Sequence, residues 1–299
     1  MRGSVVPVLT VVAVILAIWY AAVIPVNSQW VLDQAGRAGV DVTASELVRE
    51  TLSQDRPRLP APHQVAAEMW NSTVVEEWQG PQGLMNTGTL SPRSLFWHAW
   101  VTLSATLVGF GIGTGLGIVL AVGIVHNRAM DLSVMPWAIA SQTIPIIAIA
   151  PMIIVVLNAV GVTGLIPKAI ISAYLSFFPV VVGMVTGLRS PDAMQLDLMK
   201  TYNASRPEVF AKLRWPSSMP YLFASLKVGI AAALIGAIVG ELPTGAVAGL
   251  GARLLSGSYY GQTIQIWAAL FAAAIVAAGM VAIVGAIQRY TLRRMGMQQ

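Results

Sequence analysis

Five long stretches of this chain contain no Asp, Glu, Lys or Arg, and they limit its fold more than any other feature. They are Gly3–Leu32, Ser94–Asn127, Leu132–Pro167, Ala169–Leu188 and Leu254–Gln288. About 20 apolar residues are enough for a helix to cross the hydrocarbon core of a bilayer. Charged residues make up only 10% of the 299 residues, against about 25% in soluble domains. The sequence therefore predicts an all-α integral membrane protein.

The charge-free stretches, with one further apolar run around Lys227, predict about six transmembrane helices. We expect them near residues 4–26, 97–125, 133–157, 165–188, 218–241 and 263–287. A cleaved signal peptide is the alternative for the first of these. Its apolar run exceeds the roughly 7–15 residues of a signal-peptide core, and no clear cleavage site ends it. We therefore expect an N-terminal transmembrane anchor over residues 1–26.

The positions of lysine and arginine predict the orientation. With the N-terminus in the cytoplasm, the short interior segments obey the positive-inside rule. They hold Arg2, Arg128, Arg189, Lys200, Arg206, Lys212, Arg214, Arg289, Arg293 and Arg294. The C-terminus is then cytoplasmic as well. Because topology accounts for the bases, the pI of about 9.7 does not indicate nucleic acid as a partner.

Residues 27–92 then form an extracytoplasmic segment. Residues 44–55 and 61–70 have helical periodicity, and residues 78–93 read as a loop because they are rich in Gly, Pro, Asn and Ser. The segment has too few apolar residues for its own core. We expect it to cap the outer face of a permeation core formed by residues 93–299, and the sequence leaves its role open.

The second predicted span carries glycines at helical spacing. Gly109, Gly113 and Gly117 form successive G-x-x-x-G pairs, and Gly111 with Gly115 forms another. Small residues let helix backbones approach closely in lipid. The pattern indicates either tight packing within one chain or an interface between subunits.

Prolines should bend or break the third span at Pro145 and Pro151, because each removes a backbone donor. Broken helices at membrane depth occur beside protein or a water-filled cavity. Gln142 and Thr143 just before the break, and Ser176 in the next span, are therefore candidates for a translocation path. The alternative is that these polar groups satisfy freed carbonyls locally.

Glu241 is the only acid in the apolar stretches, and it falls at the predicted outer end of the fifth span. A carboxylate at membrane depth is costly and usually functional. Two interpretations stay open: a gating or structural group on the path, or a solvated helix end.

Residues 197–216 form a charged island between two apolar spans. A short helix should end at Asn203, since Asn often adopts the left-handed conformation that ends helices. Ser205 can cap a second helix with Glu208 three residues on, and Pro216 should end it. The pattern predicts a helix–turn–helix elbow in the cytoplasm, within residues 189–217.

These residues resemble the membrane subunits, or permeases, of binding-protein-dependent ABC importers. That family carries a loop of the form E-A-A-x-x-x-G-A-S, then Phe five residues after the Ser, then L-P. Here the loop reads Asp197-Leu198-Met199, Asn203-Ala204-Ser205, Phe210 and Trp215-Pro216. Asp keeps the charge of Glu, and Asn keeps the left-handed preference of Gly. Leu-Met makes the contact surface bulkier than Ala-Ala.

Other segments resemble the nitrate, sulfonate and taurine branch of that family. They are Gln142–Pro151, Phe177–Pro179, Gly187–Ser190, Ala233–Glu241 and Gly249–Gly251. With the loop, they extend the resemblance over about residues 95–295, leaving 27–92 uncovered.

The resemblance implies a type I importer architecture in which the elbow is a coupling helix seated on a cytoplasmic ATPase dimer. The implied coupling residues are Asp197, Lys200, Asn203, Ala204, Ser205, Arg206, Phe210, Leu213 and Pro216. A second permease chain, identical or homologous, would complete the pore in a bacterial cytoplasmic (inner) membrane, and an external binding protein would deliver a small solute.

No nucleotide or metal site is predicted on this chain. It contains no G-x-x-x-x-G-K-[ST] phosphate loop and no cysteine, so ATP and Mg²⁺ are expected on the partner ATPase. We expect a transport subunit without catalytic residues.

Two other functions are weighed against this one. An ion-coupled secondary transporter predicts several intramembrane ionisable groups and repeated halves, neither of which is evident. A membrane assembly protein without transport leaves the elbow and the prolines unexplained. The substrate is left open between a small anion, such as a sulfonate or nitrate, and a heterocycle such as a pyrimidine.

Overall fold

The computed structural model describes residues 2–75, 77–79, 85–87, 91, 93–243 and 246–297. The chain forms two compact units. We call Met1–His98 with Arg253–Ala273 the first unit, and Ala99–Ala252 with Ala274–Gln299 the second unit.

Within the described residues, five helices are long and apolar enough to cross a membrane, and a bent pair makes a sixth span when counted together. The long helices are α1 (Arg2–Ala38), α4 (Leu95–His126), α7 (Leu165–Leu188), α10 (Trp215–Glu241) and α12 (Thr263–Arg294), and the bent pair is α5 (Arg128–Ser141) with α6 (Ile146–Ala159). This confirms the predicted all-α architecture with about six spans.

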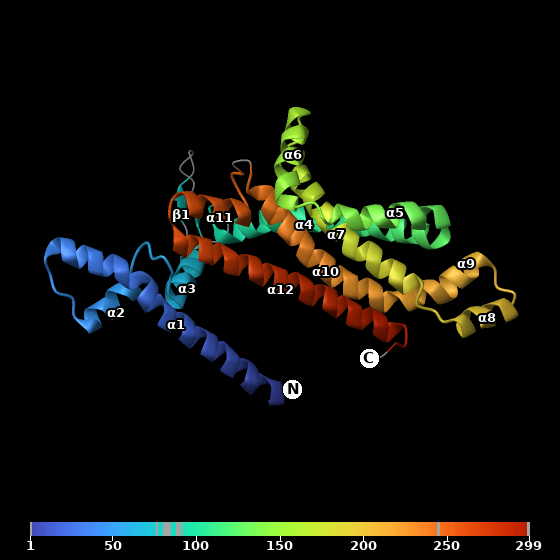
Figure 1. Ribbon diagram of the computed structural model, residues 1–299, viewed down its shortest axis with the longest axis horizontal. Helices are drawn as coiled ribbons and strands as arrows, with labels where there is room; N and C mark the ends of the chain where they lie inside the picture. The colour runs from blue at the N-terminus through green and yellow to red at the C-terminus, as the bar shows by residue number, and fades with distance from the viewer. Residues whose placement is uncertain are drawn as a thin grey trace. The chain divides into compact units, whose positions relative to one another are not determined.

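The third predicted span is broken. Helices α5 and α6 meet at an angle of 98°, which Figure 1 shows as a sharp turn. Pro145 stands at the N-terminal cap of α6, where its missing N–H leaves no helical hydrogen bond unmade. Pro151 lies inside α6, which continues through it. The predicted break is thus confirmed at Pro145, whereas Pro151 ends no helix.

In the second unit, α4 and α7 approach each other at glycines. A Cβ atom on Gly109 would stand 2.3 Å from Ser172 Cβ. One on Gly113 would stand 2.2 Å from Ser176 Oγ. Real Cβ atoms do not come this close to other atoms, so only glycine permits this helix contact. The structure supports packing within one chain for this glycine series.

The alternate glycines of α4 face a different direction. A Cβ atom added to Gly111 or Gly115 would meet nothing within 4 Å among the described residues. The two glycine series of α4 therefore differ in role, although their spacing in the sequence is the same.

Helix α10 packs antiparallel against α7, again through small residues. A Cβ atom on Gly236 would stand 2.7 Å from Ser172 Cα, and one on Gly187 would stand 2.9 Å from Ser218 Cα. Helices α4 and α10 therefore both approach α7 closely at Ser172. In lipid, such contacts supply the dispersion energy that holds helices together.

In the first unit, α2 (Ala44–Leu52) and α3 (Pro62–Trp70) confirm the helical periodicity predicted over 44–55 and 61–70. Thr43 caps α2, since its Oγ1 accepts from Glu46 N–H at 3.4 Å, and its hydroxyl and N–H donate to Glu46 Oε2 at 2.6 and 2.9 Å. These hydrogen bonds hold the pKa of Glu46 below its ordinary value. A turn of π-helix, η1 (Asn71–Val75), follows α3.

A buried amide on α1 holds the polar segment that follows it. The Asn27 side chain is 1% exposed. Its Nδ2 donates to the carbonyl oxygens of Thr51 and Leu59 at 3.3 and 2.9 Å, and its Oδ1 accepts from Leu59 N–H at 3.1 Å. The part of the predicted extracytoplasmic segment around Thr51 and Leu59 is therefore held against α1.

Two boundaries differ from the sequence prediction. Helix α1 continues to Ala38 and not to residue 26, because residues 27–38 are polar but compatible with a helix, which stops before the left-handed Gly39 (φ 66°). The predicted loop 78–93 contains paired strands, β1 (Glu77–Gln79) and β2 (Met85–Thr87). Residues 80–84, 88–90 and 92 of that prediction lie outside the described residues.

The glycine contacts can be tested with two single-methyl changes. Gly109→Ala should lower the stability of the detergent-solubilised protein by about 1–3 kcal/mol, because the new methyl overlaps Ser172. Gly111→Ala adds the same methyl to open space on the same helix, and it should leave stability unchanged or slightly raised. Thermal unfolding of the two variants provides the measurement. Equal midpoints would contradict the packing.

Candidate functional site

The elbow consists of α8 (Ala193–Thr201), a turn and α9 (Arg206–Val209), which continues through the π-helical turn η3 (Phe210–Arg214) into α10. Figure 1 shows α8 and α9 beyond the adjoining ends of α7 and α10. Asn203 has φ 51°, which confirms the predicted left-handed turn. Asn203 N–H donates to Lys200 O at 2.8 Å and Ala204 N–H to Met199 O at 3.0 Å. These two bonds form a Schellman motif, which fixes the direction of the turn.

Both helices of the elbow are capped. Asp192 Oδ1 accepts from Gln195 N–H at 2.7 Å at the start of α8. The N–H and hydroxyl of Ser205 donate to Glu208 Oε2 at 2.9 and 2.8 Å, which confirms the predicted cap. Lys212 Nζ then contacts the other oxygen of Glu208 at 3.1 Å. The elbow is therefore an ordered structure specified by its own local residues.

The prediction that Pro216 ends the second helix is wrong. Trp215 N–H donates to Phe210 O, five residues back, within the wider turn of η3. Pro216 occupies the first turn of α10. The wide turn accommodates the proline, so the elbow and α10 form one continuous helix.

The large exposed apolar side chains of the elbow lie on α8 and at its C-terminal cap, Tyr202. Met194, Leu198 and Tyr202 are 79%, 54% and 75% exposed, and their spacing of four places them on one face of a helix. We call these three residues the α8 ridge. Met194 and Tyr202 were not predicted from the sequence, although their spacing of four from Leu198 indicates a shared helix face.

Phe210 points inward instead. Its ring lies 5.2 Å from that of His126 at the end of α4 and 5.9 Å from that of Trp215, measured between centroids. Arg214 Nη1 donates to Leu188 O at 3.0 Å. The elbow is thereby fastened to the ends of α4 and α7.

The remaining predicted coupling residues differ in exposure. Lys200 pairs with Asp197 at 2.8 Å on the exposed surface of α8. Asn203, Ser205 and Arg206 are exposed, and Ala204 and Leu213 are half-buried.

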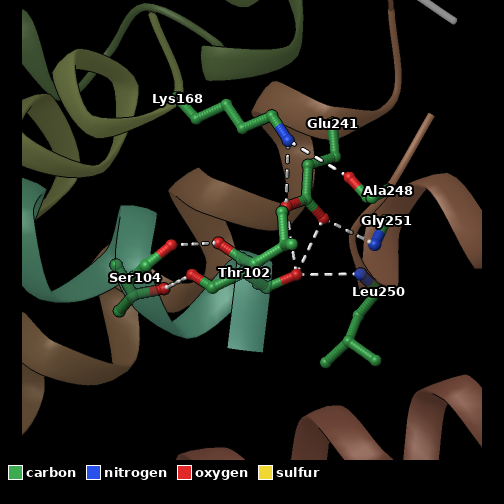
Figure 2. A network of polar contacts seen from close by, with 9 residues as sticks. Thr102, Ser104, Lys168, Glu241, Ala248, Leu250 and Gly251 are labelled. Carbon is green, nitrogen blue, oxygen red and sulfur yellow. Dashed lines mark hydrogen bonds and ion pairs between the residues drawn. The ribbon is translucent and has the colours of Figure 1, made fainter. Parts of the chain in front are cut away.

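Glu241 lies in a closed polar network (Figure 2). Its side chain is 0% exposed, so the reading of a solvated helix end does not hold. The Thr102 hydroxyl lies 3.0 and 2.9 Å from the two carboxylate oxygens. Gly251 N–H donates to Oε2 at 2.8 Å, and Lys168 Nζ lies 3.4 Å from Oε1. The buried charge thus has a cationic partner and hydrogen bonds, as burial requires.

The same network holds the loop that follows α10. Lys168 Nζ also donates to Ala248 O at 3.2 Å, and Thr102 Oγ1 accepts from Leu250 N–H at 2.8 Å. A Cβ atom on Gly249 (φ 131°) would stand 2.2 Å from Glu241 Cδ. Glycine is needed there both for the backbone conformation and for the approach of the carboxylate.

Lys168 was not predicted as a site residue from the sequence. The available signal was its position, as the single charge between two charge-free stretches. Its partner Glu241 is 73 residues away in the chain.

The predicted path residues fall in three places. Gln142 and Thr143 lie together at the break before Pro145. The Tyr174 hydroxyl donates to Ser141 O and so connects this break to α7. The amide nitrogen of Gln142 is buried without a hydrogen-bond partner among the described residues. Ser176 is fully buried against Gly113, apart from Glu241.

A cavity of about 540 Å³ lies beside Lys168 in the second unit. Polar side chains of Ser104, Asn158 and Thr163 line it together with apolar residues such as Ile154. Because Glu241 neutralises Lys168, the cavity offers hydrogen-bonding groups without a large net charge.

The comparison with known families agrees with these features. The model of binding-protein-dependent transport system inner membrane components matches residues 113–297, more than half of the chain. This chain belongs to that family. It is a multi-pass membrane protein and a permease subunit of an ABC importer. This assignment excludes the two alternatives, an ion-coupled secondary transporter and an assembly protein without transport. The family's permeases act with an ABC ATPase and a solute-binding protein.

Curated relatives carry transport names. The riboflavin transport system permease protein RibX of Chloroflexus aurantiacus is 29% identical over 235 residues, 79% of this chain and 80% of that protein. The formylaminopyrimidine transport permease protein ThiX of Halalkalibacterium halodurans is 34% identical over 57% of this chain and 66% of its own. The putative aliphatic sulfonates transport permease protein SsuC of Bacillus subtilis is 24% identical over 61% of this chain and 64% of its own.

The Lys168–Glu241 pair predicts a specific pattern of stabilities. Lys168→Met should destabilise the protein by about 3–5 kcal/mol, because it leaves a buried carboxylate without its cation. The double variant Lys168→Met/Glu241→Gln should recover most of that loss, since the amide keeps the shape and most hydrogen bonds. Lys200→Met, in the exposed pair with Asp197, should cost at most about 1 kcal/mol. Thermal unfolding in detergent measures all three, and a double variant as unstable as the single one would contradict the pairing.

Proposed function

We propose that this permease is driven by a cytoplasmic ATPase dimer that seats the α8 ridge in a groove on its surface. The exposed ridge of Met194, Leu198 and Tyr202 on a capped helix supports this proposal most directly. Apolar anchors surrounded by charged groups such as Asp197 and Lys200 are typical of a protein interface with a polar rim. Three large apolar side chains on one exposed helix face favour contact with a partner over contact with water alone.

The contacts of Phe210 and Arg214 favour transmission of a movement at the elbow to the membrane helices. Since α9, η3 and α10 are continuous, a shift of the elbow acts directly on α10. Helix α10 has 27 residues and is therefore about 40 Å long. Glu241 lies at its far end, where the polar network holds α4, α7 and the following loop. We infer that Glu241 has a structural or gating role at that end.

The translocation path, in this proposal, runs beside the break at Gln142–Pro145. An amide buried without a partner is costly, and a polar solute or water passing the break would supply one. Thr143 adds an exposed hydroxyl there. Ser176 becomes part of the path only if α4 and α7 separate during transport.

The remaining partners and the location are proposed on the basis of the family. We propose that ATP and Mg²⁺ bind to the ATPase chains, that a second permease, identical or homologous, completes the pore, and that both termini are cytoplasmic in a bacterial inner membrane. The external binding protein would deliver the solute on the side of Glu241.

The substrate that we favour is a small heterocycle. RibX and ThiX, whose names refer to riboflavin and formylaminopyrimidine, are more similar to this chain than SsuC, whose name refers to aliphatic sulfonates. The cavity beside Lys168, which is neutralised by Glu241, suits hydrogen bonding to ring carbonyls and nitrogens better than it suits a free anion. Direct binding measurements on the partner binding protein, with pyrimidines against sulfonates and nitrate, test this assignment.

The role of the ridge is tested by a matched pair of tyrosines. Tyr202→Ala should weaken ATPase association about tenfold or more and lower ATP-dependent uptake, because buried aromatic anchors dominate interface energy. Tyr259→Ala removes an equally exposed tyrosine, 80% against 75%, outside the elbow, and it should change neither property. Co-purification of the ATPase with each variant gives the measurement. Unchanged ATPase association in Tyr202→Ala would rule out the ridge as the docking surface.

A further inference from the structure

The second unit has more cations than its acids can neutralise. Each of its five acidic side chains already has a partner in the described residues. They are Asp131 with Arg189, Asp192 with the N-terminus of α8, Asp197 with Lys200, Glu208 with Lys212, and Glu241 with Lys168. Lys227 of α10 and Arg289 of α12 have no acidic partner among the described residues of this unit.

These two cations converge on one point. A Cβ atom on Gly285 of α12 would stand 3.9 Å from Lys227 Nζ and 4.0 Å from Arg289 Nη1. The glycine therefore leaves the space into which both side chains extend from neighbouring helices. Like charges this close repel each other, and the repulsion grows where water is scarce. An anion between them would remove that cost.

The surroundings of the pair are apolar. Lys227 is half-buried, and the buried side chains of Phe223, Ile230 and Val284 belong to the cluster that joins the two helices around it. A lysine beside such a cluster extends its ammonium towards the membrane surface. The pair therefore lies at the border between apolar side chains and a polar phase.

The position along the helices indicates which membrane surface this is. Lys227 lies about 18 Å along α10 from Trp215, where the elbow ends, and Arg289 comes just before the basic C-terminal turn with Arg293 and Arg294. If the elbow is cytoplasmic, as the proposed function requires, the pair lies in the inner-leaflet half of the membrane, and its two long side chains extend towards the headgroups of that leaflet.

Exposed apolar side chains flank the two cations. Val228 on α10 is 59% exposed, and Ile283 and Ile287 on α12 are 61% and 50% exposed. A free oxyanion would use only the charges, whereas a lipid can also cover these side chains with its acyl chains. Basic pockets between transmembrane helices on the cytoplasmic side are a known form of lipid headgroup site.

We propose that Lys227 and Arg289 bind the phosphate of an anionic inner-leaflet phospholipid beside Gly285, between α10 and α12. The phosphodiester, with its one negative charge, lies between the two cations and offsets their repulsion, and the acyl chains of the lipid pack on Ile283 and Ile287 of α12. Because α10 is continuous with the elbow, the bound lipid stabilises the helix that transmits the movement of the ATPase.

The test uses the complete transporter with its ATPase, in nanodiscs of phosphatidylcholine containing phosphatidylglycerol. After transfer to detergent, native mass spectrometry counts the phosphatidylglycerol retained per permease. Lys227→Gln/Arg289→Gln should reduce retention about tenfold or more, since both charge-assisted hydrogen bonds are lost. Arg293→Gln/Arg294→Gln removes the same charge from the end of α12 and should retain the lipid as the unchanged protein does.

Two results would overturn the proposal. One is equal lipid retention by the pair variant and the unchanged protein. The other is an unchanged protein that retains added inorganic phosphate but no phospholipid, because the pair would then serve a free oxyanion. ATPase co-purification is scored in the same samples. If the ATPase fails to co-purify with the unchanged protein, the proposed function is refuted. This outcome does not depend on the amount of lipid retained.

Discussion

The close approach of α4, α7 and α10 at Ser172 is the contact on which the rest of the second unit depends. Lipid does not drive apolar helices together as water does, so association relies on close packing and on polar contacts. Gly109 and Gly236 let two helices reach Ser172 from different directions. This crossing fixes the three helices along their length, and it places Thr102, Lys168 and Glu241 together at one end and the elbow at the other.

The polar network and the elbow represent two solutions to the same difficulty, which is a charged group on a chain made mostly for lipid. At one end, Glu241 is removed from solvent and receives a cation, a hydroxyl and a backbone N–H. At the other, the charges stay outside, pair with each other and leave an apolar ridge for a soluble partner. The first arrangement requires residues from four segments, while the second is built almost entirely within one.

That difference explains which parts of the site could be predicted. The turn at Asn203 and the cap at Ser205 depend only on residues within five positions of each other, so both could be predicted from the sequence. The predicted helix end at Pro216 was wrong because a π-helical turn accommodates the proline, and such a turn has no clear sequence signature. Phe210 is among the coupling residues that the resemblance implies, yet its ring packs on His126, and this contact between two helices leaves no local sequence pattern.

The sequence by itself determined the membrane-spanning character, the number of spans, the break at Pro145 and the form of the elbow. Each follows from composition or from interactions a few residues long. Only the tertiary structure decided that Glu241 is buried, that Lys168 is its partner, and which of the glycines on α4 carries the packing. Thr102 and Glu241 are 139 residues apart, and no local pattern records such a meeting, because it depends on how whole helices pack in three dimensions.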